Sequence, residues 1–203
     1  CAVLEPDADG LHVYENGLGV LANSPSFPWH RTNLLNYAGL RARDHGPVRL
    51  SREEIAPCFS GSGAQGLPGD WSSPSRFVRL AFLKTYGVKG ATESAGVGAM
   101  FRLLQSAAFP LGMVRVPQPE SPGGLEGDIL PYDYTVYTAV ACAESLRFYW
   151  TTYENQRIQF VDLSTLRHQT RPVQFELGRW PDFRELVPAS ASAASPISFV
   201  SSL

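Results

Sequence analysis

The chain has 203 residues, of which 17 are basic, 19 are acidic and 44% are hydrophobic, and its formal net charge is −2. This length allows one domain with a buried core, and the balanced charge gives no electrostatic reason to expect a nucleic acid or an anionic membrane surface as a partner. No apolar run reaches the roughly 18 residues of a membrane-spanning helix, so we predict no transmembrane segment.

The start of the chain predicts a β-hairpin and a further strand. Residues 1–5 and the alternating residues 11–14 flank a turn that ends at Gly10. A short apolar strand is predicted over residues 18–22. This strand would deliver Asn23 to its end, where a polar side chain can leave the sheet and face a cleft.

Three helices are predicted in the middle of the chain. The first covers residues 28–40, and residues 41–73 after it consist mostly of turn signals. Ser73 is the predicted N-cap of the second helix, which continues to Gly87. The third helix is predicted over residues 93–109.

Strands are predicted again towards the end of the chain. After a loop over residues 112–131, aromatic and β-branched residues predict three strands, over residues 132–142, 146–153 and 158–163. Strands, then helices, then strands indicate an α+β layered domain rather than a parallel βαβ fold. The Ser/Ala-rich tail over residues 188–203 is predicted to be disordered.

Neither a nucleotide site nor a metal site is indicated. The stretch GSGAQG at residues 61–66 fits the G-x-G-x-x-G pattern, but no strand precedes it and Leu67–Pro68–Gly69–Asp70 interrupts any helix after it. The cysteines at positions 1, 58 and 142 show no metal-binding spacing and cannot all pair. Unpaired cysteines favour a reducing, cytoplasmic location.

Two long segments resemble one enzyme family. Residues 21–37, LANSPSFPWHRTNLLNY, are similar to the "L-T-N-S-P-x-F-x-W-H…T-N-L-x-N-Y" segment of the choloylglycine hydrolases, which comprise bile salt hydrolases and penicillin V acylases. Residues 66–79, GLPGDWSSPSRFVR, are similar to that family's "G-L-P-G-D-x-S-S-x-S-R-F-V-R" segment. YTVY at residues 134–137 and YWTTYENQRI at residues 149–158 resemble its closing strands, so the resemblance covers about residues 1–165.

The resemblance implies a fold and a chemistry. Members of the family are N-terminal nucleophile hydrolases with a four-layer αββα sandwich, and they cleave linear amides. The thiol of an N-terminal cysteine attacks the amide carbonyl and its own α-amine accepts the proton. By resemblance, Asn23 is the side-chain donor to the oxyanion, and Arg76 lies beside the nucleophile, where a guanidinium favours the thiolate.

These residues also have ordinary structural interpretations. An asparagine before Ser-Pro is commonly a turn former, and an isolated arginine is commonly a surface or capping residue. His30 is expected to be packed or hydrogen-bonded rather than a proton shuttle, since the mechanism needs no histidine. Arg79, one turn after Arg76, is expected to form a structural salt bridge.

Cys1 is not expected to be the nucleophile. In the family well over a hundred residues separate the nucleophile from the N-S-P-x-F asparagine, whereas Asn23 follows Cys1 by 22 positions. We therefore expect Cys1 to lie in a strand away from Asn23 and Arg76. Residues 1–187 would then be part of one choloylglycine-hydrolase-like domain whose N-terminal part, with the nucleophile, is missing, and the chain alone would be inactive. The alternatives are a small hydrolase that uses Cys1 and a scaffold domain without activity.

The resemblance also bears on substrate and partners. It favours a glycine- or taurine-conjugated bile salt over penicillin V as the small-molecule amide substrate. It implies no metal or organic cofactor, because a thiol, an amine and hydrogen-bond donors suffice. A homo-oligomer, a homotetramer by resemblance, is expected.

Overall fold

The computed structural model describes residues 1–115, 132–178 and 180–186. Most of the predicted loop over residues 112–131 and the whole predicted tail over residues 188–203 lie outside these ranges. None of the described helices is both long and apolar enough to cross a membrane.

The predicted N-terminal hairpin is confirmed. Strands β1 (Ala2–Asp7) and β2 (Gly10–Glu15) pair antiparallel, with Val3 opposite Tyr14 and Leu4 opposite Val13. Because side chains alternate between the faces of a strand, Val3 is buried against the core while Leu4 and Val13 are exposed on the opposite face.

The predicted strand over residues 18–22 is wrong. Residues 18–22 form no strand and pair with no strand in the described part of the chain, and Gly19 adopts a left-handed φ of 59°. The buried Asn16 side chain, rather than a neighbouring strand, bonds the backbone of this segment. Asn16 Nδ2 donates to the Val20 carbonyl at 3.0 Å, and Asn16 Oδ1 accepts from the Gly19 N–H at 2.8 Å. Local side-chain bonds of this kind replace strand pairing.

The first predicted helix is shorter than expected. Helix α1 (Phe27–Asn33) buries Phe27 and His30, and the chain continues as a 3-10 helix, η1 (Leu34–Tyr37). No residue of η1 is fully buried, although Leu34 packs against the core, and the α-helix does not extend to residue 40.

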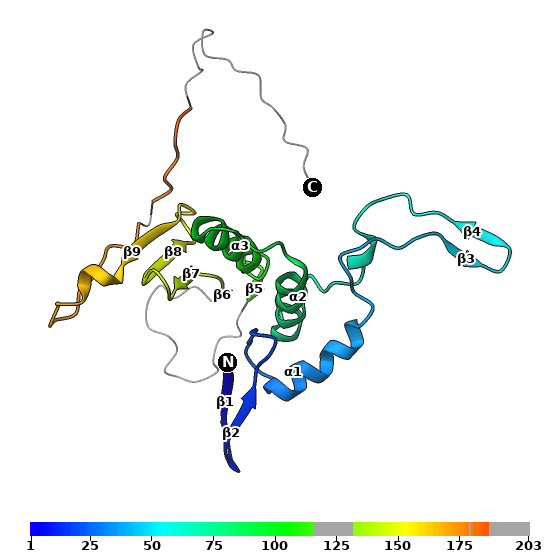
Figure 1. Cartoon of the computed structure of the whole chain (residues 1–203), viewed down its shortest axis with the longest axis horizontal. Coiled ribbons are helices and arrows are strands. Elements are labelled where there is room, and N and C mark those ends of the chain that lie inside the picture. The colour runs from blue at the N-terminus through cyan, green and yellow to red at the C-terminus, as the bar shows by residue number, and fades with distance from the viewer. Residues whose placement is uncertain (116–131, 179, 187–203) are drawn as a thin grey trace, which may run out of the picture.

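A hairpin occupies the region predicted to be turns. Strands β3 (Val48–Leu50) and β4 (Glu53–Ile55) pair antiparallel, and Figure 1 shows them projecting far from the rest of the molecule. Ser51 adopts a left-handed φ of 55° in the hairpin turn. The sequence offered no signal for this turn, because glycine or asparagine is usual at such positions.

The GSGAQG stretch serves packing. It contains the short 3-10 helix η2 (Ser62–Ala64). A Cβ at Gly63 would lie 2.1 Å from the Arg43 carbonyl oxygen and 2.5 Å from that of Arg41. Only glycine allows this close backbone approach, and the Gly63 carbonyl accepts a bond from the Arg41 N–H at 2.9 Å.

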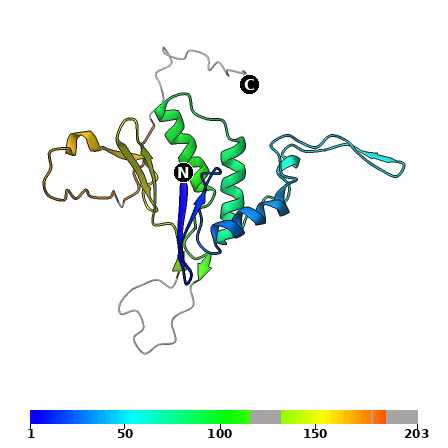
Figure 2. The ribbon, with the colours of Figure 1, turned by 60° about the horizontal axis from the view of Figure 1, so that its bottom comes forward.

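Two helices form the centre of the molecule. Helix α2 (Ser73–Tyr86) has Ser72 as its N-cap, one residue before the predicted cap, and ends at Gly87 as predicted. Helix α3 (Glu93–Gln105) is capped by Thr92. It ends before residue 109, because Ser106 caps it and a turn follows to Pro110. Figures 1 and 2 agree that α3 lies between α2 and the C-terminal sheet.

The C-terminal strands are confirmed with changed limits. The predicted strand over residues 132–142 is split, because residues 134–136 interrupt it. Its first part, β6 (Tyr132–Asp133), pairs with β5 (Val114–Arg115), and its second part, β7 (Tyr137–Cys142), begins a three-stranded antiparallel sheet with β8 (Arg147–Thr152) and β9 (Gln159–Asp162). A last 3-10 helix, η3 (Leu163–Leu166), follows.

The main core joins the hairpin, α1 and α2. It is built from five buried side chains: Val3, Val20, Phe27, Phe77 and Ala81. The structure is thus a mixture of helices and antiparallel strands, as the α+β prediction required. The four-layer αββα arrangement stays a prediction.

Candidate active site

Asn23 and Arg76 come together in the structure. Arg76 Nη2 donates a hydrogen bond of 3.0 Å to Asn23 Oδ1, across 53 positions of sequence. A guanidinium has only donors, so the Asn23 amide oxygen faces Arg76. Its two N–H donors are therefore left for another acceptor, and no described residue accepts a hydrogen bond from them.

The backbone of Asn23 is held by two further side chains. Its carbonyl oxygen accepts from Ser73 Oγ at 2.6 Å and lies 2.7 Å from His30 Nε2. His30 is completely buried and stacks on Phe77, with 4.7 Å between ring centroids. The expectation that His30 is packed and hydrogen-bonded is confirmed.

Three groups hold the Arg76 guanidinium. Besides the bond to Asn23, Nε donates to the Trp71 carbonyl at 3.0 Å, and the guanidinium carbon lies 4.9 Å from the centroid of the Phe109 ring, a cation–π distance. The Trp71 indole N–H donates to the Ala108 carbonyl at 3.0 Å, which ties the two supporting segments together. Arg76 is therefore fixed in direction.

Asp70 organises the start of α2, where Arg76 lies. Its carboxylate accepts from the Ser72 N–H at 2.9 Å and from Ser75 Oγ at 2.6 Å. Hydrogen bonds from Ser72 and Ser75 lower the pKa of Asp70 to about 2. The Gly/Pro-rich loop thus acts as a scaffold for the first turn of the helix.

The predicted salt bridge of Arg79 is wrong. Arg79 is buried, and its Nε donates to the Ser106 carbonyl at 2.8 Å, while Nη1 donates to the carbonyls of Pro68 and Asp70 at 2.6 and 3.0 Å. No carboxylate of the described residues pairs with it. The fork of donors suits several carbonyls at once, and burial lowers the pKa of Arg79.

Asn23 lines a groove of about 420 Å³ between the β1–β2 hairpin and the segment before α1. The groove contains the carboxylates of Glu5 and Asp7, and His12 Nε2 lies 2.9 Å from Asp7 Oδ2 on the hairpin. Its lining consists of Leu4, Glu5, Pro6, Asp7, His12, Tyr14, Ala22, Asn23, Ser24, Pro25 and Ser26.

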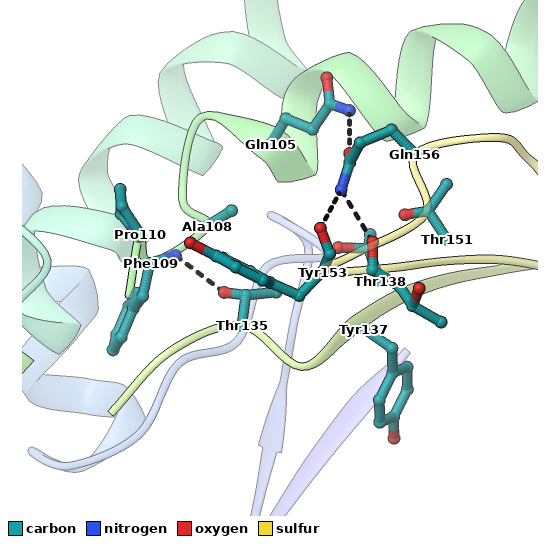
Figure 3. A pocket seen from close by; sticks show the side chains of 11 residues that line it. Gln105, Ala108, Phe109, Pro110, Thr135, Tyr137, Thr138, Thr151, Tyr153 and Gln156 are labelled. Atoms are coloured by element: carbon teal, nitrogen blue, oxygen red, sulfur yellow. Dashed lines mark hydrogen bonds between the residues drawn. The ribbon is translucent and has the colours of Figure 1, made fainter. Parts of the chain in front are cut away.

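A second cavity, of about 260 Å³, lies between the end of α3 and strands β7 and β8 (Figure 3). Phe109, which supports Arg76, belongs to its wall. The polar groups here largely bond one another: Thr135 Oγ1 accepts from the Phe109 N–H at 2.8 Å, and Gln156 Nε2 donates to the carbonyls of Thr152 and Tyr153. None of the described residues that line this cavity is charged.

Cys1 directly precedes β1 and is bonded to Asn16. Its thiol donates to the Asn16 carbonyl at 3.2 Å, and its own carbonyl accepts from the Asn16 N–H at 2.8 Å. Among the described residues, no hydrogen bond joins Cys1 to Asn23 or Arg76. The three cysteines are unpaired, and the part of the chain that the structure describes contains no group of three or more potential metal ligands.

Two contributors to this arrangement, Ser73 and Phe109, are not predicted by the sequence patterns. Ser73 was expected only to cap the helix, although its spacing of three from Arg76 places both on one face of α2. Phe109 gave no signal, since it lies 33 positions after Arg76 and contributes only its ring face.

Comparison with known proteins agrees with the resemblance. A model of the family described as linear amide C-N hydrolases, choloylglycine hydrolase family, matches residues 1–172. The chain is 35% identical over 162 residues to a bile salt hydrolase/transferase of Clostridium perfringens, covering 80% of this chain and 46% of that protein. It is 38% identical over 146 residues to a conjugated bile acid hydrolase of Lactobacillus gasseri, covering 72% and 42%.

Solved structures show the same relationship. A mutant of the conjugated bile acid hydrolase from Clostridium perfringens superimposes with a TM-score of 0.76 at 29% identity, covering 92% of this chain and 54% of that one. A penicillin V acylase from Agrobacterium tumefaciens, at 15% identity, shares the fold with a TM-score of 0.56, covering 80% and 42%. The chain spans about half the length of the curated relatives it matches. It belongs to the choloylglycine hydrolase family of linear amide hydrolases.

Proposed function

We propose that the chain is the C-terminal part of an enzyme that hydrolyses conjugated bile salts, and that Asn23 and Arg76 are its contribution to the active site. The observation that carries the proposal is the hydrogen bond from Arg76 to Asn23 Oδ1, which turns the amide oxygen towards Arg76 and leaves the Asn23 N–H donors for another acceptor. The names of the relatives, bile salt hydrolase/transferase and conjugated bile acid hydrolase, support the substrate class.

In the proposed reaction, a cysteine thiolate attacks the carbonyl carbon of the amide, and the thiol proton passes to the cysteine α-amine. The carbonyl oxygen becomes an oxyanion that accepts a hydrogen bond from Asn23 Nδ2. The C–N bond then breaks, the leaving amine takes the proton, and water hydrolyses the thioester. Arg76 keeps the Asn23 donor aimed at the oxyanion before the reaction starts, so no reorganisation is needed during it.

The nucleophile would come from the part of the enzyme that the relatives possess and this chain does not cover. The coverage of 46% of the Clostridium perfringens relative supports this division. The thiol of Cys1 is bonded to Asn16, which supports a structural place for Cys1. The chain alone would then be inactive.

A scaffold without activity and a penicillin V acylase are less well supported. A scaffold would have no need of an exposed amide such as that of Asn23, whose oxygen is bonded to Arg76 while its N–H groups bond no described residue. The penicillin V acylase match rests on 15% identity, which carries the fold alone. No cofactor takes part in the proposed chemistry, and the three unpaired cysteines support a reducing, cytoplasmic location.

A homo-oligomer is also proposed, with the β3–β4 arm reaching a second copy of the chain. An isolated two-stranded hairpin is marginally stable in water, yet Figure 1 shows this hairpin projecting with nothing beside it. Its apolar side chains Val48, Leu50 and Ile55 are between 47% and 59% exposed. Arg49 lies opposite Glu54 on the arm, so both charge signs are available for pairing between identical arms.

A chimeric enzyme tests the proposal. Residues 1–172 replace the matching segment of the Clostridium perfringens relative, and release of glycine from a glycine-conjugated bile salt is measured. We expect the chimera to hydrolyse the substrate, Asn23→Ala to lower kcat by about 10²- to 10³-fold, and the control Asn36→Ala to leave kcat unchanged. The isolated chain should release no glycine. Hydrolysis by the isolated chain that is lost on Cys1→Ala would instead establish Cys1 as the nucleophile.

A further inference from the structure

The segment that carries Asn23 lacks regular secondary structure. Residues 22–26 belong to no helix or strand, and Asn23 itself is exposed. A catalytic donor needs a fixed position, and the strand that was expected to supply it is absent. The two side chains that contact the Asn23 carbonyl, His30 and Ser73, come from α1 and α2 and therefore join this segment to both helices.

The chemistry of this contact fixes the form of His30. A backbone carbonyl oxygen accepts and cannot donate. His30 Nε2, at 2.7 Å, must therefore carry the hydrogen, as must the Ser73 hydroxyl at 2.6 Å. The carbonyl has two lone pairs, so it can accept both bonds at once.

This arrangement leaves the other nitrogen of His30 without a partner. Nδ1 is buried and makes no hydrogen bond to any described residue. Around it the ring stacks on Phe77 with 16° between the planes, and the Trp29 ring meets it edge-on at 5.6 Å between centroids. A buried polar nitrogen without a hydrogen-bond partner is destabilising, whereas an apolar ring of the same shape would not be. Packing alone would therefore be served better by phenylalanine than by histidine at position 30.

We propose that His30 and Ser73 are positioning residues that hold the Asn23 backbone, so that Arg76 can orient its side chain. His30 acts through the hydrogen on Nε2, and its buried Nδ1, which bonds no described residue, is a cost in stability that is retained for function. The proposal rests on the proposed role of Asn23 as oxyanion donor, and it adds residues that do not touch the substrate.

Nuclear magnetic resonance on the full chain tests the contact without any activity assay. The nitrogen chemical shifts of His30 should report a hydrogen on Nε2, and the Asn23 backbone amide should have an order parameter near that of rigid backbone, about 0.85. In His30→Phe and Ser73→Ala the order parameter of Asn23 should fall, towards about 0.6. A His30 ring without hydrogen on Nε2, or an Asn23 that is as rigid in both variants as in the parent chain, would overturn the proposal.

Kinetics of the chimera test the consequence. His30→Phe keeps the stacked ring and removes the donor, so kcat should fall at least about 10-fold with KM unchanged, while Tm stays the same or rises. His30→Gln, which places a donor near the former Nε2, should recover most of kcat. The exposed His168 serves as the control, and His168→Phe should change neither kcat nor Tm.

The outcomes separate the two proposals. If Asn23→Ala abolishes activity while His30→Phe leaves kcat unchanged, the role of Asn23 stands and the role of His30 is refuted. If His30→Phe lowers Tm and kcat together and His30→Gln restores neither, His30 is a packing residue only. If Asn23→Ala itself leaves kcat unchanged, the proposed function fails, and the resonance measurements still decide whether His30 and Ser73 hold Asn23.

Discussion

Arg76 and Asn23 are joined by one hydrogen bond of 3.0 Å, from Arg76 Nη2 to Asn23 Oδ1. This bond connects the first turn of α2 to an irregular segment that lies 53 positions earlier. It also determines how the amide is turned, because arginine can only donate. The donor face of Asn23 is therefore set by Arg76, and the direction of Arg76 is set by Trp71 and Phe109.

Replacement of Arg76 should affect the rate more than binding. In the chimera, Arg76→Met removes the donor to Asn23 Oδ1, and we expect kcat to fall about 100-fold with a small change in KM. Arg76→Lys retains the charge without the planar fork, so it should recover only part of the loss. Steady-state release of glycine measures both, with Arg102→Met on the exposed side of α3 as the control. Equal activity of Arg76→Met and the parent chimera would refute the role of Arg76.

Asp70 should stabilise the chain in a pH-dependent way. Its pKa of about 2 in the folded chain is below the ordinary value of 3.8, so the unfolded chain binds more protons between these values and stability rises with pH there. Asp70→Asn should lower the free energy of unfolding by about 1 kcal/mol at neutral pH.

The difference between the parent chain and Asp70→Asn should shrink as the pH falls from about 4 towards 2. Urea unfolding of both chains at several pH values measures it, with Asp9→Asn in the β1–β2 turn as the control. A difference that is constant down to the lowest pH would show that ionisation of Asp70 is not the cause.

Gly63 should be intolerant of any side chain. A Cβ there would meet the Arg43 carbonyl oxygen at 2.1 Å, so Gly63→Ala should destabilise the base of the arm by about 1 to 3 kcal/mol. Hydrogen exchange of the Arg41 N–H, which bonds the Gly63 carbonyl at 2.9 Å, reports this locally. Gly46→Ala is the matched control, because nothing lies within 4 Å of a Cβ at that position. Unchanged exchange at Arg41 in Gly63→Ala would contradict the packing role.

The β3–β4 arm should carry the association of copies. Leu50→Asp adds a charge to the exposed apolar side of the arm, 59% exposed at this residue, and should reduce the oligomer to monomer. Sedimentation velocity of the full chain measures the change, and circular dichroism checks the fold. Leu35→Asp, at a residue 75% exposed on η1, is the control. A full chain that sediments as a monomer before any substitution would refute the proposal.

Local patterns predicted most of the fold. The β1–β2 hairpin and the start of α2 follow from signals within a few residues of each element, the turn at Gly10 and the serine and proline at the helix start. The prediction of a strand over residues 18–22 was wrong because the Asn16 side chain makes hydrogen bonds with the backbone of Gly19 and Val20. The β3–β4 hairpin was missed because Ser51 occupies a turn position where glycine is usual.

The candidate site depended on resemblance for its residues and on the structure for its geometry. Nothing in the sequence could indicate that Arg76 bonds Asn23 or lies over Phe109, since these contacts join distant segments. The contact of His30 with Asn23 could not be predicted from the sequence either, because His30 bonds a backbone carbonyl, and every residue has one.

The kcat of the Asn23→Asp chimera is the most direct test of whether Asn23 donates a hydrogen bond to the oxyanion. Aspartate keeps the size of the side chain and an oxygen for Arg76, but its carboxylate has no N–H to donate. With a glycine-conjugated bile salt as substrate, we expect a kcat at least about 100-fold below that of the parent chimera, with Tm unchanged. A kcat within about twofold of the parent, in a variant of equal Tm, would show that Asn23 does not donate to the oxyanion.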